Sequence, residues 1–156
     1  MDAKNPPQSS QSTPQGDSSE APATTPIAAK QPRYQNVLVV EDEHFIGELY
    51  TRALTKAGYN VKVVIDGQEG LKEAQTNTYD IILLDLMIPN LTGTELLKSL
   101  RDPKITPHLK SKIIITTNLE QADEAKEEIE KQADGYVVKA EVTPKQLVAF
   151  LQSFEQ

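Results

Sequence analysis

Cysteine is absent from the 156-residue sequence, and histidine occurs only twice, as His44 and His108. Without cysteine the chain forms no disulfide bond and no thiolate metal site, and two histidines are too few for a histidine-rich metal site. A metal ion bound by this chain would therefore have oxygen ligands. The sequence also has no apolar run of about 18 residues to span a bilayer, and its N-terminus lacks the apolar core of a secretion signal. We therefore expect a cytoplasmic protein without a membrane segment.

Basic residues are in the minority, since 16 Lys and Arg stand against 23 Asp and Glu and give a formal net charge of -7. A protein that binds a polyanion needs a clustered basic surface, so the charge argues against nucleic acid as a partner. Hydrophobic residues make up 38% of the chain, which is enough for one domain with a proper core.

Branched aliphatic residues are nearly absent from residues 1–33, where Ile27 is the only one, whereas six of the ten prolines lie there. Such a segment cannot bury enough apolar surface to offset the entropy lost on ordering. We predict a disordered tail rich in Pro, Ser, Gln and Thr over residues 1–33 and one folded domain over residues 34–156. The tail is either a tether or docking segment or a dispensable solvated extension.

Five short apolar runs follow the tail, and each is continuous rather than alternating, as in strands that are covered on both faces. The runs are Val37–Val40, Val61–Ile65, Ile81–Leu84, Ile113–Ile115 and Tyr136–Val138. Between the runs lie stretches whose apolar residues have helical spacing. Parallel strands need a crossover connection, which a helix provides. The pattern predicts an α/β domain with a doubly wound five-stranded parallel sheet. Its longest connection, residues 102–111, contains Pro103 and Pro107 and is predicted to be a surface loop.

Helix boundaries and buried helix faces can also be predicted. Capping-box spacing marks three helix starts, at Asp66–Glu69, Thr92–Glu95 and Thr143–Gln146. Pro144 stands at the tolerated first helical position, and Gly58 is placed to end the first helix. Two apolar stripes indicate core-facing helix sides, one formed by Phe45, Ile46, Leu49 and Ala53 and the other by Leu147, Phe150, Leu151 and Phe154.

Polar side chains follow four of the five predicted strands. Glu41 and Asp42 come after the first run, Asp85 after the third, Thr116 and Thr117 after the fourth, and Lys139 after the fifth. The carboxyl ends of parallel strands line one crevice, so these groups should converge there. Taken singly, each has an ordinary reading as a helix cap, a turn former, a strand residue or an exposed lysine. Their joint occurrence at four strand ends favours a functional site.

Three neighbouring carboxylates repel one another, so their burial requires a compensating positive charge. Oxygen ligands with access to water suit Mg²⁺, and together with Lys139 such an ion brings the cluster close to neutrality. A carboxylate placed in this way can attack a phosphoryl group in line, while the cations neutralise the phosphoryl oxygens. Asp85 is the candidate nucleophile because it ends a strand and precedes a turn over residues 86–89.

These residues resemble the receiver domains of bacterial response regulators in two-component systems, over about Tyr34–Phe154. The matching segments are Glu41-Asp42-Glu43, Asp85-Leu86-Met87-Ile88-Pro89 with the later Gly93, and Gly135-Tyr136-Val137-Val138-Lys139. Thr117 matches better than Thr116, because it lies 22 positions before Lys139, the spacing of the chemotaxis-type single-domain regulators.

The resemblance implies a flavodoxin-like (βα)5 fold with strand order 2-1-3-4-5. It also implies that Mg²⁺ is held by Glu41, Asp42, Asp85 and the backbone carbonyl of Met87. Asp85 would accept a phosphoryl group from a histidine kinase or a histidine phosphotransfer protein. Thr117 and Lys139 would contact the phosphoryl oxygens, and Tyr136 would turn inward in response.

The implied protein is a phosphoacceptor that assists its own phosphorylation and dephosphorylation, not an enzyme with a separate substrate. Its fourth helix, fifth strand and fifth helix would form the surface that an unknown downstream protein reads. It would be a monomer or a phosphorylation-dependent dimer. Since no effector segment follows Phe154, we expect a stand-alone regulator that signals through protein–protein contacts.

Some positions depart from the family pattern or bear on the phosphoryl lifetime. Ala140 replaces the usual proline after the lysine, and a cis bond before a non-proline residue would cost about 2.5–4 kcal/mol, so we expect a trans bond. Asn118 replaces a small residue and either narrows phosphate access or adds a hydrogen bond. Apolar Met87 and Leu119 flank the route of the hydrolytic water and predict slow loss of the phosphoryl group.

Two other functions are compatible with such a sheet. The first is a receiver-like interaction module that acts without phosphorylation. The second is an enzyme or flavin protein, which the sequence disfavours. Haloacid-dehalogenase-type phosphatases need Asp-x-Asp after the first strand, where this chain has Glu41-Asp42-Glu43, and a flavodoxin needs a phosphate-binding loop there that is missing.

Overall fold

A computed structural model of the chain describes residues 34–118 and 123–155. The predicted tail, residues 1–33, and Leu119 lie outside the described residues. Among the helices of the described part, none is long and apolar enough to cross a membrane.

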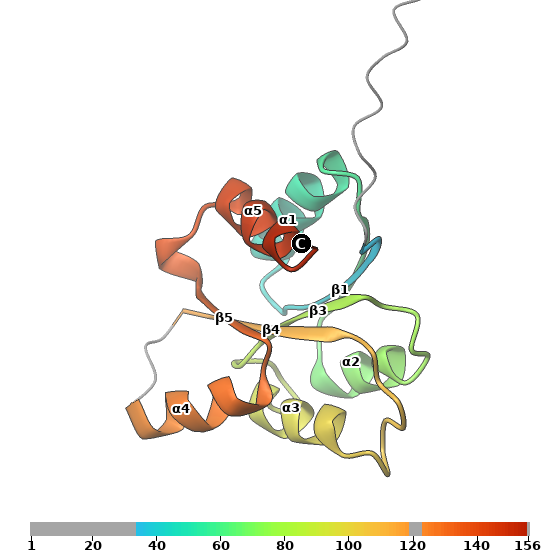
Figure 1. Ribbon diagram of the computed structural model, residues 1–156. Coiled ribbons are helices and arrows are strands. Elements are labelled where there is room, and N and C mark those ends of the chain that lie inside the picture. Colours follow the sequence, from blue (N-terminus) through green and yellow to red (C-terminus); the bar gives the residue numbers. More distant parts are fainter. Residues whose placement is uncertain (1–33, 119–122, 156) are drawn as a thin grey trace, which may run out of the picture.

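Five strands form one parallel sheet in the order β2-β1-β3-β4-β5, which confirms the predicted doubly wound topology (Figure 1). The strands are β1 Asn36–Val40, β2 Asn60–Val64, β3 Ile81–Asp85, β4 Lys112–Thr117 and β5 Gly135–Val138. The prediction was wrong about Ile65, which follows β2 and is 58% exposed. Val64 pairs with Val40, the last residue of β1, so Ile65 has no neighbouring strand to pair with.

The helices cover both faces of this sheet. They are α1 His44–Lys56, α2 Gly67–Ala74, α3 Gly93–Arg101, α4 Asp123–Gln132 and α5 Pro144–Ser153, with a short 3-10 turn, η1, at Lys139–Glu141. Helices α1 and α5 lie on one face, and α2, α3 and α4 lie on the other (Figure 1). The loop predicted over residues 102–111 joins α3 to β4.

Alternate residues of a strand enter two separate apolar clusters, which explains why the runs are continuous. In β3, Ile82 and Leu84 pack with the α2, α3 and α4 side, whereas Ile81 and Leu83 pack with the α1 and α5 side. All four side chains are fully buried. Burying a side chain of this kind contributes about 1.5–3 kcal/mol, so β3, the middle strand of the sheet, stabilises both apolar clusters.

The predicted helix boundaries hold. Thr92 and Thr143 form reciprocal capping boxes with Glu95 and Gln146, and Asp66 accepts a hydrogen bond from the Glu69 backbone. Gly58 follows α1 with a φ of 101°, a left-handed conformation that glycine adopts without strain.

Of the two predicted apolar helix stripes, the one on α5 contains buried residues, whereas the one on α1 includes an exposed residue. On α5, Leu147 and Leu151 are buried. On α1 the prediction was wrong about Phe45, which is 69% exposed, since the buried face runs through Gly47, Tyr50 and Leu54. Phe45 lies in the first turn of α1, five residues after the end of β1, and its exposure shows that this turn is not covered by the sheet.

The C-terminal segment is fastened to the edge of the sheet where the strands begin. The Tyr59 hydroxyl, just before β2, donates a hydrogen bond of 2.8 Å to Glu155 Oε1. Burial and this carboxylate partner both raise the pKa of Tyr59. The described chain therefore ends at the amino edge of the sheet, opposite the strand ends that carry the predicted site.

Candidate functional site

Three carboxylates meet at the carboxyl ends of β1 and β3. Glu41, Asp42 and Asp85 each offer an oxygen atom, and these oxygens lie within 4.8 Å of one another. Glu41 is 1% exposed and Asp85 4% exposed, whereas Asp42 faces solvent. The chain leaves β1 for β2 on one side and reaches β3 on the other, so the cluster lies at the topological switch point, where ligands bind in open α/β sheets.

Lys139 supplies the positive charge that the sequence required. It follows β5 in the turn η1, and its ammonium donates to Glu41 Oε2 and, at 2.9 Å, to Asp85 Oδ2. The Lys139 side chain is only 3% exposed. One cation thus lies between two buried anions that would otherwise repel each other.

The remaining oxygens of these carboxylates are held by the backbone. Glu41 Oε1 accepts from the Glu43 N–H at 3.1 Å, and Asp85 Oδ1 accepts from the Met87 N–H at 3.0 Å. Gly93 allows the start of α3 to approach the Asp85 main chain closely, because a Cβ at position 93 would lie 2.4 Å from the Asp85 carbonyl oxygen, and the Gly93 N–H donates to the Leu86 carbonyl at 3.1 Å. The carboxylates are therefore oriented before any ligand binds.

Burial and ion pairing shift the acid–base behaviour of this cluster. Burial raises the pKa of Glu41 from 4.5 to about 7, although the hydrogen bond from Lys139 opposes this shift. Burial alone would lower the pKa of Lys139, but its hydrogen bonds to Asp85 and Glu41 more than compensate and raise it. Lys139 is therefore charged at neutral pH, and Glu41 retains affinity for a proton or for another cation.

The donor set fits a magnesium ion. All three side chains offer oxygen, which hard divalent cations prefer, and the exposed Asp42 leaves room for the water ligands that Mg²⁺ keeps. A group of two buried and one exposed carboxylate with a single lysine also retains an excess negative charge. The predicted ligand Met87 lies in the loop after β3, with its side chain 61% exposed.

The other predicted residues lie at the same edge of the sheet. Thr117 ends β4, is completely buried and pairs with Val138, while Thr116 pairs with Asp85 itself. Asn118 is exposed just beyond β4. The described residues contain no cis peptide bond, so the Lys139–Ala140 bond is trans, as expected.

Tyr136 lies on β5, and its position differs from that of a surface tyrosine. The ring packs against the apolar cluster on the α2, α3 and α4 side of the sheet, and its hydroxyl oxygen is buried. The inward orientation that was predicted as a response to phosphorylation is thus already the orientation of the ring in this structure.

Sequence reasoning missed an apolar rim around the acidic cluster. Phe45, Ile65 and Met87 are exposed large hydrophobic residues, and each follows one of the strands β1, β2 and β3. A shallow cavity of about 250 Å³ between α1 and β2 is lined by both Ile65 and Glu41. A large apolar residue within five positions after a strand end, as at Phe45, Ile65 and Met87, is the sequence signal that could have identified it.

Comparison with known proteins matches most of the described chain to one family. The sequence model of the response regulator receiver domain matches residues 37–152 of the chain. The response regulator ArlR of Staphylococcus haemolyticus is 38% identical over 104 residues, which are 67% of this chain and 45% of that protein. ArlR of Staphylococcus saprophyticus is 39% identical over 103 residues, 66% of this chain and 44% of that protein. The chain therefore spans less than half the length of these relatives.

Solved structures give the same result. The chemotaxis protein CheY4 of Vibrio cholerae superposes with a TM-score of 0.66 at 32% identity, over 77% of this chain and 98% of that one. A CheY-like receiver domain from Methanospirillum hungatei superposes with a TM-score of 0.67 at 26% identity, over 78% and 93% of the two chains.

Proposed function

The chain belongs to the response regulator receiver domains of two-component systems, and on that premise we propose that Asp85 accepts a phosphoryl group from a phosphohistidine of a kinase or phosphotransfer protein. The observation that carries the proposal is the contact of one buried ammonium, Lys139, with both Glu41 and Asp85 at the carboxyl edge of the sheet. We further propose that the chain signals by protein–protein contact and not as an enzyme that turns over a separate substrate.

In the transfer, an Asp85 carboxylate oxygen attacks phosphorus as the bond from phosphorus to the histidine nitrogen breaks. The Met87 N–H and Lys139 hold Asp85 in place, so little orientational freedom is lost at the moment of reaction. Lys139, and the Thr117 hydroxyl at the end of β4, would then contact the phosphoryl oxygens. Glu41, Asp42, Asp85 and the Met87 carbonyl would hold Mg²⁺, which when bound neutralises the charge of the incoming phosphoryl oxygens.

A direct test uses acetyl phosphate as a small phosphoryl donor. We expect the intact mass of the wild-type chain to rise by one phosphoryl group when acetyl phosphate and Mg²⁺ are both present. Chelation of the metal by EDTA should reduce the modified fraction to background, since the carboxylates then repel the donor. A mass that does not change in the presence of Mg²⁺ would favour the alternative of a receiver-like module that acts without phosphorylation.

The exposed residues Phe45, Ile65 and Met87 form the apolar rim, and we propose that the phosphohistidine-bearing protein docks on it. A donor histidine can reach Asp85 only if its protein covers the carboxyl edge, where these three side chains lie. Large apolar side chains exposed after three strands of one sheet edge are a feature that an interaction site would explain.

Replacing Phe45 by Lys should therefore slow transfer from a protein donor by about tenfold or more, the effect of losing about 1.4 kcal/mol or more of interface energy. Phosphorylation by acetyl phosphate should be unchanged, because that donor does not need the rim. The measurement compares the rate of transfer from the protein donor with the rate of phosphorylation by acetyl phosphate. Both rates are also measured in an Ile105→Lys control, which changes an exposed apolar residue in the loop between α3 and β4. Equal slowing with both donors would contradict the docking role.

Met87 should also control how long the phosphoryl group persists. Its apolar side chain lies two residues after Asp85 and offers no hydrogen bond to a hydrolytic water. We expect the Met87→Asn variant to lose its phosphoryl group several-fold faster than the wild type, because the amide can orient that water. The decay of the phosphorylated mass after removal of the donor measures this rate, and a Met87→Leu variant, which stays apolar, should decay like the wild type. An unchanged rate in Met87→Asn would count against the hypothesis.

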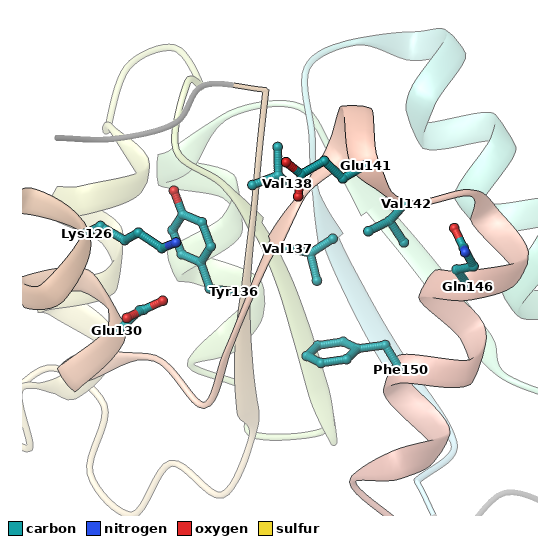
Figure 2. A pocket seen from close by; sticks show the side chains of 9 residues that line it. All are labelled: Lys126, Glu130, Tyr136, Val137, Val138, Glu141, Val142, Gln146 and Phe150. Atoms are coloured by element: carbon teal, nitrogen blue, oxygen red, sulfur yellow. The ribbon is translucent and has the colours of Figure 1, made fainter. Parts of the chain in front are cut away.

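The output surface is proposed to be the face formed by α4, β5 and α5. A groove of about 400 Å³ runs between these elements, with Glu130 on one wall, Val142 and Phe150 on the other, and Tyr136 on β5 (Figure 2). β5 is the last strand of the sheet, and Lys139 follows it directly, so the acidic site and this groove share one strand. A downstream protein that contacts the groove can therefore sense the state of Asp85.

A further inference from the structure

The C-terminal end of helix α4 is held to the domain by polar contacts in addition to a buried apolar side chain. The Arg101 guanidinium of α3 donates to the Gln132 carbonyl at 2.6 Å and to Asp134 Oδ2 at 2.9 Å. Asp134 Oδ2 in turn accepts from the Ile113 N–H of β4 at 2.8 Å. This network ties the end of α4 to α3 and β4. The only large apolar side chain within α4 is Ile129, which is buried.

Lys126, in the first half of α4, contacts the Tyr136 ring of β5. Its ammonium nitrogen lies 5.3 Å from the centroid of the Tyr136 ring, on the face of that ring (Figure 2). A cation within about 6 Å of an aromatic centroid is attracted by the ring quadrupole. Among the residues that the structure describes, no ion pair engages Lys126. The ring is thus the group that this ammonium is placed to contact.

The geometry leaves Tyr136 between two environments. On one side the ring packs against the apolar cluster under α4, with its hydroxyl buried. On the other side Lys126 covers its face, and both residues line the groove between α4, β5 and α5. If the ring left the cluster, it would project into that groove and change the space between Glu130 and Phe150.

We propose that Lys126 is a positioning residue that holds the Tyr136 ring in its buried orientation and thereby couples α4 to β5. Loss of the ammonium removes the attraction on the exposed face of the ring, and the ring then leaves the cluster more often. The groove is consequently open when Lys126 covers the ring and narrowed when it does not. The inference rests on the proposed function only where it treats this groove as the output surface, because ring position is a property of the unmodified chain.

The experiment uses the full chain with ¹³C-labelled tyrosine rings and NMR. The Tyr136 signals are identified by their loss in Tyr136→Phe and are separated from those of the other four tyrosines. Three variants are compared. Lys126→Met keeps the length and apolar stem but removes the charge, Lys126→Arg keeps the charge, and Lys131→Met removes the same charge from an exposed lysine on the same helix.

In Lys126→Met we expect the Tyr136 ring signals to shift, and their relaxation by a soluble paramagnetic agent to rise by roughly two- to fivefold, the population change that an exposed cation–π contact supports. The other four tyrosines should not change, and Lys126→Arg and Lys131→Met should match the wild type. Equal Tyr136 signals in Lys126→Met and Lys131→Met would overturn the proposal. So would a change at all five tyrosines, which would show general loosening and not a local role.

The outcome is independent of phosphoryl transfer. If the wild type gains a phosphoryl group but Lys126→Met leaves the ring unmoved, the proposed function stands and the role of Lys126 fails. If the ring responds as expected but no phosphoryl group is gained, the role of Lys126 stands and the proposed function fails.

Discussion

Replacing Lys139 by Met is expected to lower the free energy of unfolding by about 3–5 kcal/mol at pH 8 without divalent cations, the typical effect of removing one partner of a buried ion pair. The ammonium contacts both Glu41 and Asp85, and the side chains of all three are at least 95% buried. Without Lys139 two buried carboxylates face each other with no cation between them. Urea unfolding in EDTA measures the loss.

Two further observations would show that the effect is electrostatic. Mg²⁺ at 100 times its dissociation constant should restore about 2.7 kcal/mol by mass action. Lower pH should also reduce the difference. The folded-state pKa of Glu41, about 7, lies above its ordinary value of 4.5. The folded state therefore takes up a proton more readily than the unfolded chain does. As the pH falls through about 7, Glu41 becomes protonated in the folded state, and the penalty for burying its negative charge disappears. Lys145→Met, which removes an exposed lysine from α5, serves as the control. If Lys139→Met is no less stable than this control, the electrostatic account of the site is wrong.

Asp85→Asn should abolish phosphorylation by acetyl phosphate, leaving the intact mass unchanged after incubation. The amide has the shape of the carboxylate but lacks the anionic oxygen that attacks phosphorus. The affinity for Mg²⁺ should fall by more than about tenfold, because even outer-shell partners of a metal site contribute factors of about 10–100. Mass spectrometry and magnesium titration measure the two effects.

Asp66→Asn provides the matched control for this substitution. Asp66 also follows a strand, β2, but its side chain caps α2, and asparagine caps a helix equally well. This variant should gain the phosphoryl group as the wild type does. Modification of Asp85→Asn to the wild-type extent would place the phosphoryl group on a different residue.

The fold was predictable because each strand carries its own signal. β3 is buried on both faces, so its continuous apolar run is distinctive, and Thr92 and Thr143 mark helix starts through local backbone hydrogen bonds. Both kinds of signal depend only on neighbouring residues. The predictions were wrong about Phe45 and Ile65, where burial depends on how far the adjacent strand extends, which is not a local property.

The candidate site was predictable in its composition but not in its contacts. Parallel topology brings the ends of β1, β3, β4 and β5 to one edge, so residue types at strand ends were sufficient to select Glu41, Asp85 and Lys139. The contact of one ammonium with both carboxylates could not be predicted, because it depends on how far the Lys139 side chain extends across β4. The contact of Lys126 with Tyr136 joins a helix to a strand, and no residue pattern in either segment indicates it.

The hydrogen bond between Tyr59 and Glu155 has a practical consequence for experiments on this domain. Tyr34 precedes β1 and Glu155 is fastened beside the start of β2, so both ends of the described chain lie on the side away from the acidic crevice. A surface anchor or fluorescent label attached close to Tyr34 or Glu155 would leave the crevice facing free solution. Binding partners could then be presented to an immobilised domain without obstruction by its attachment.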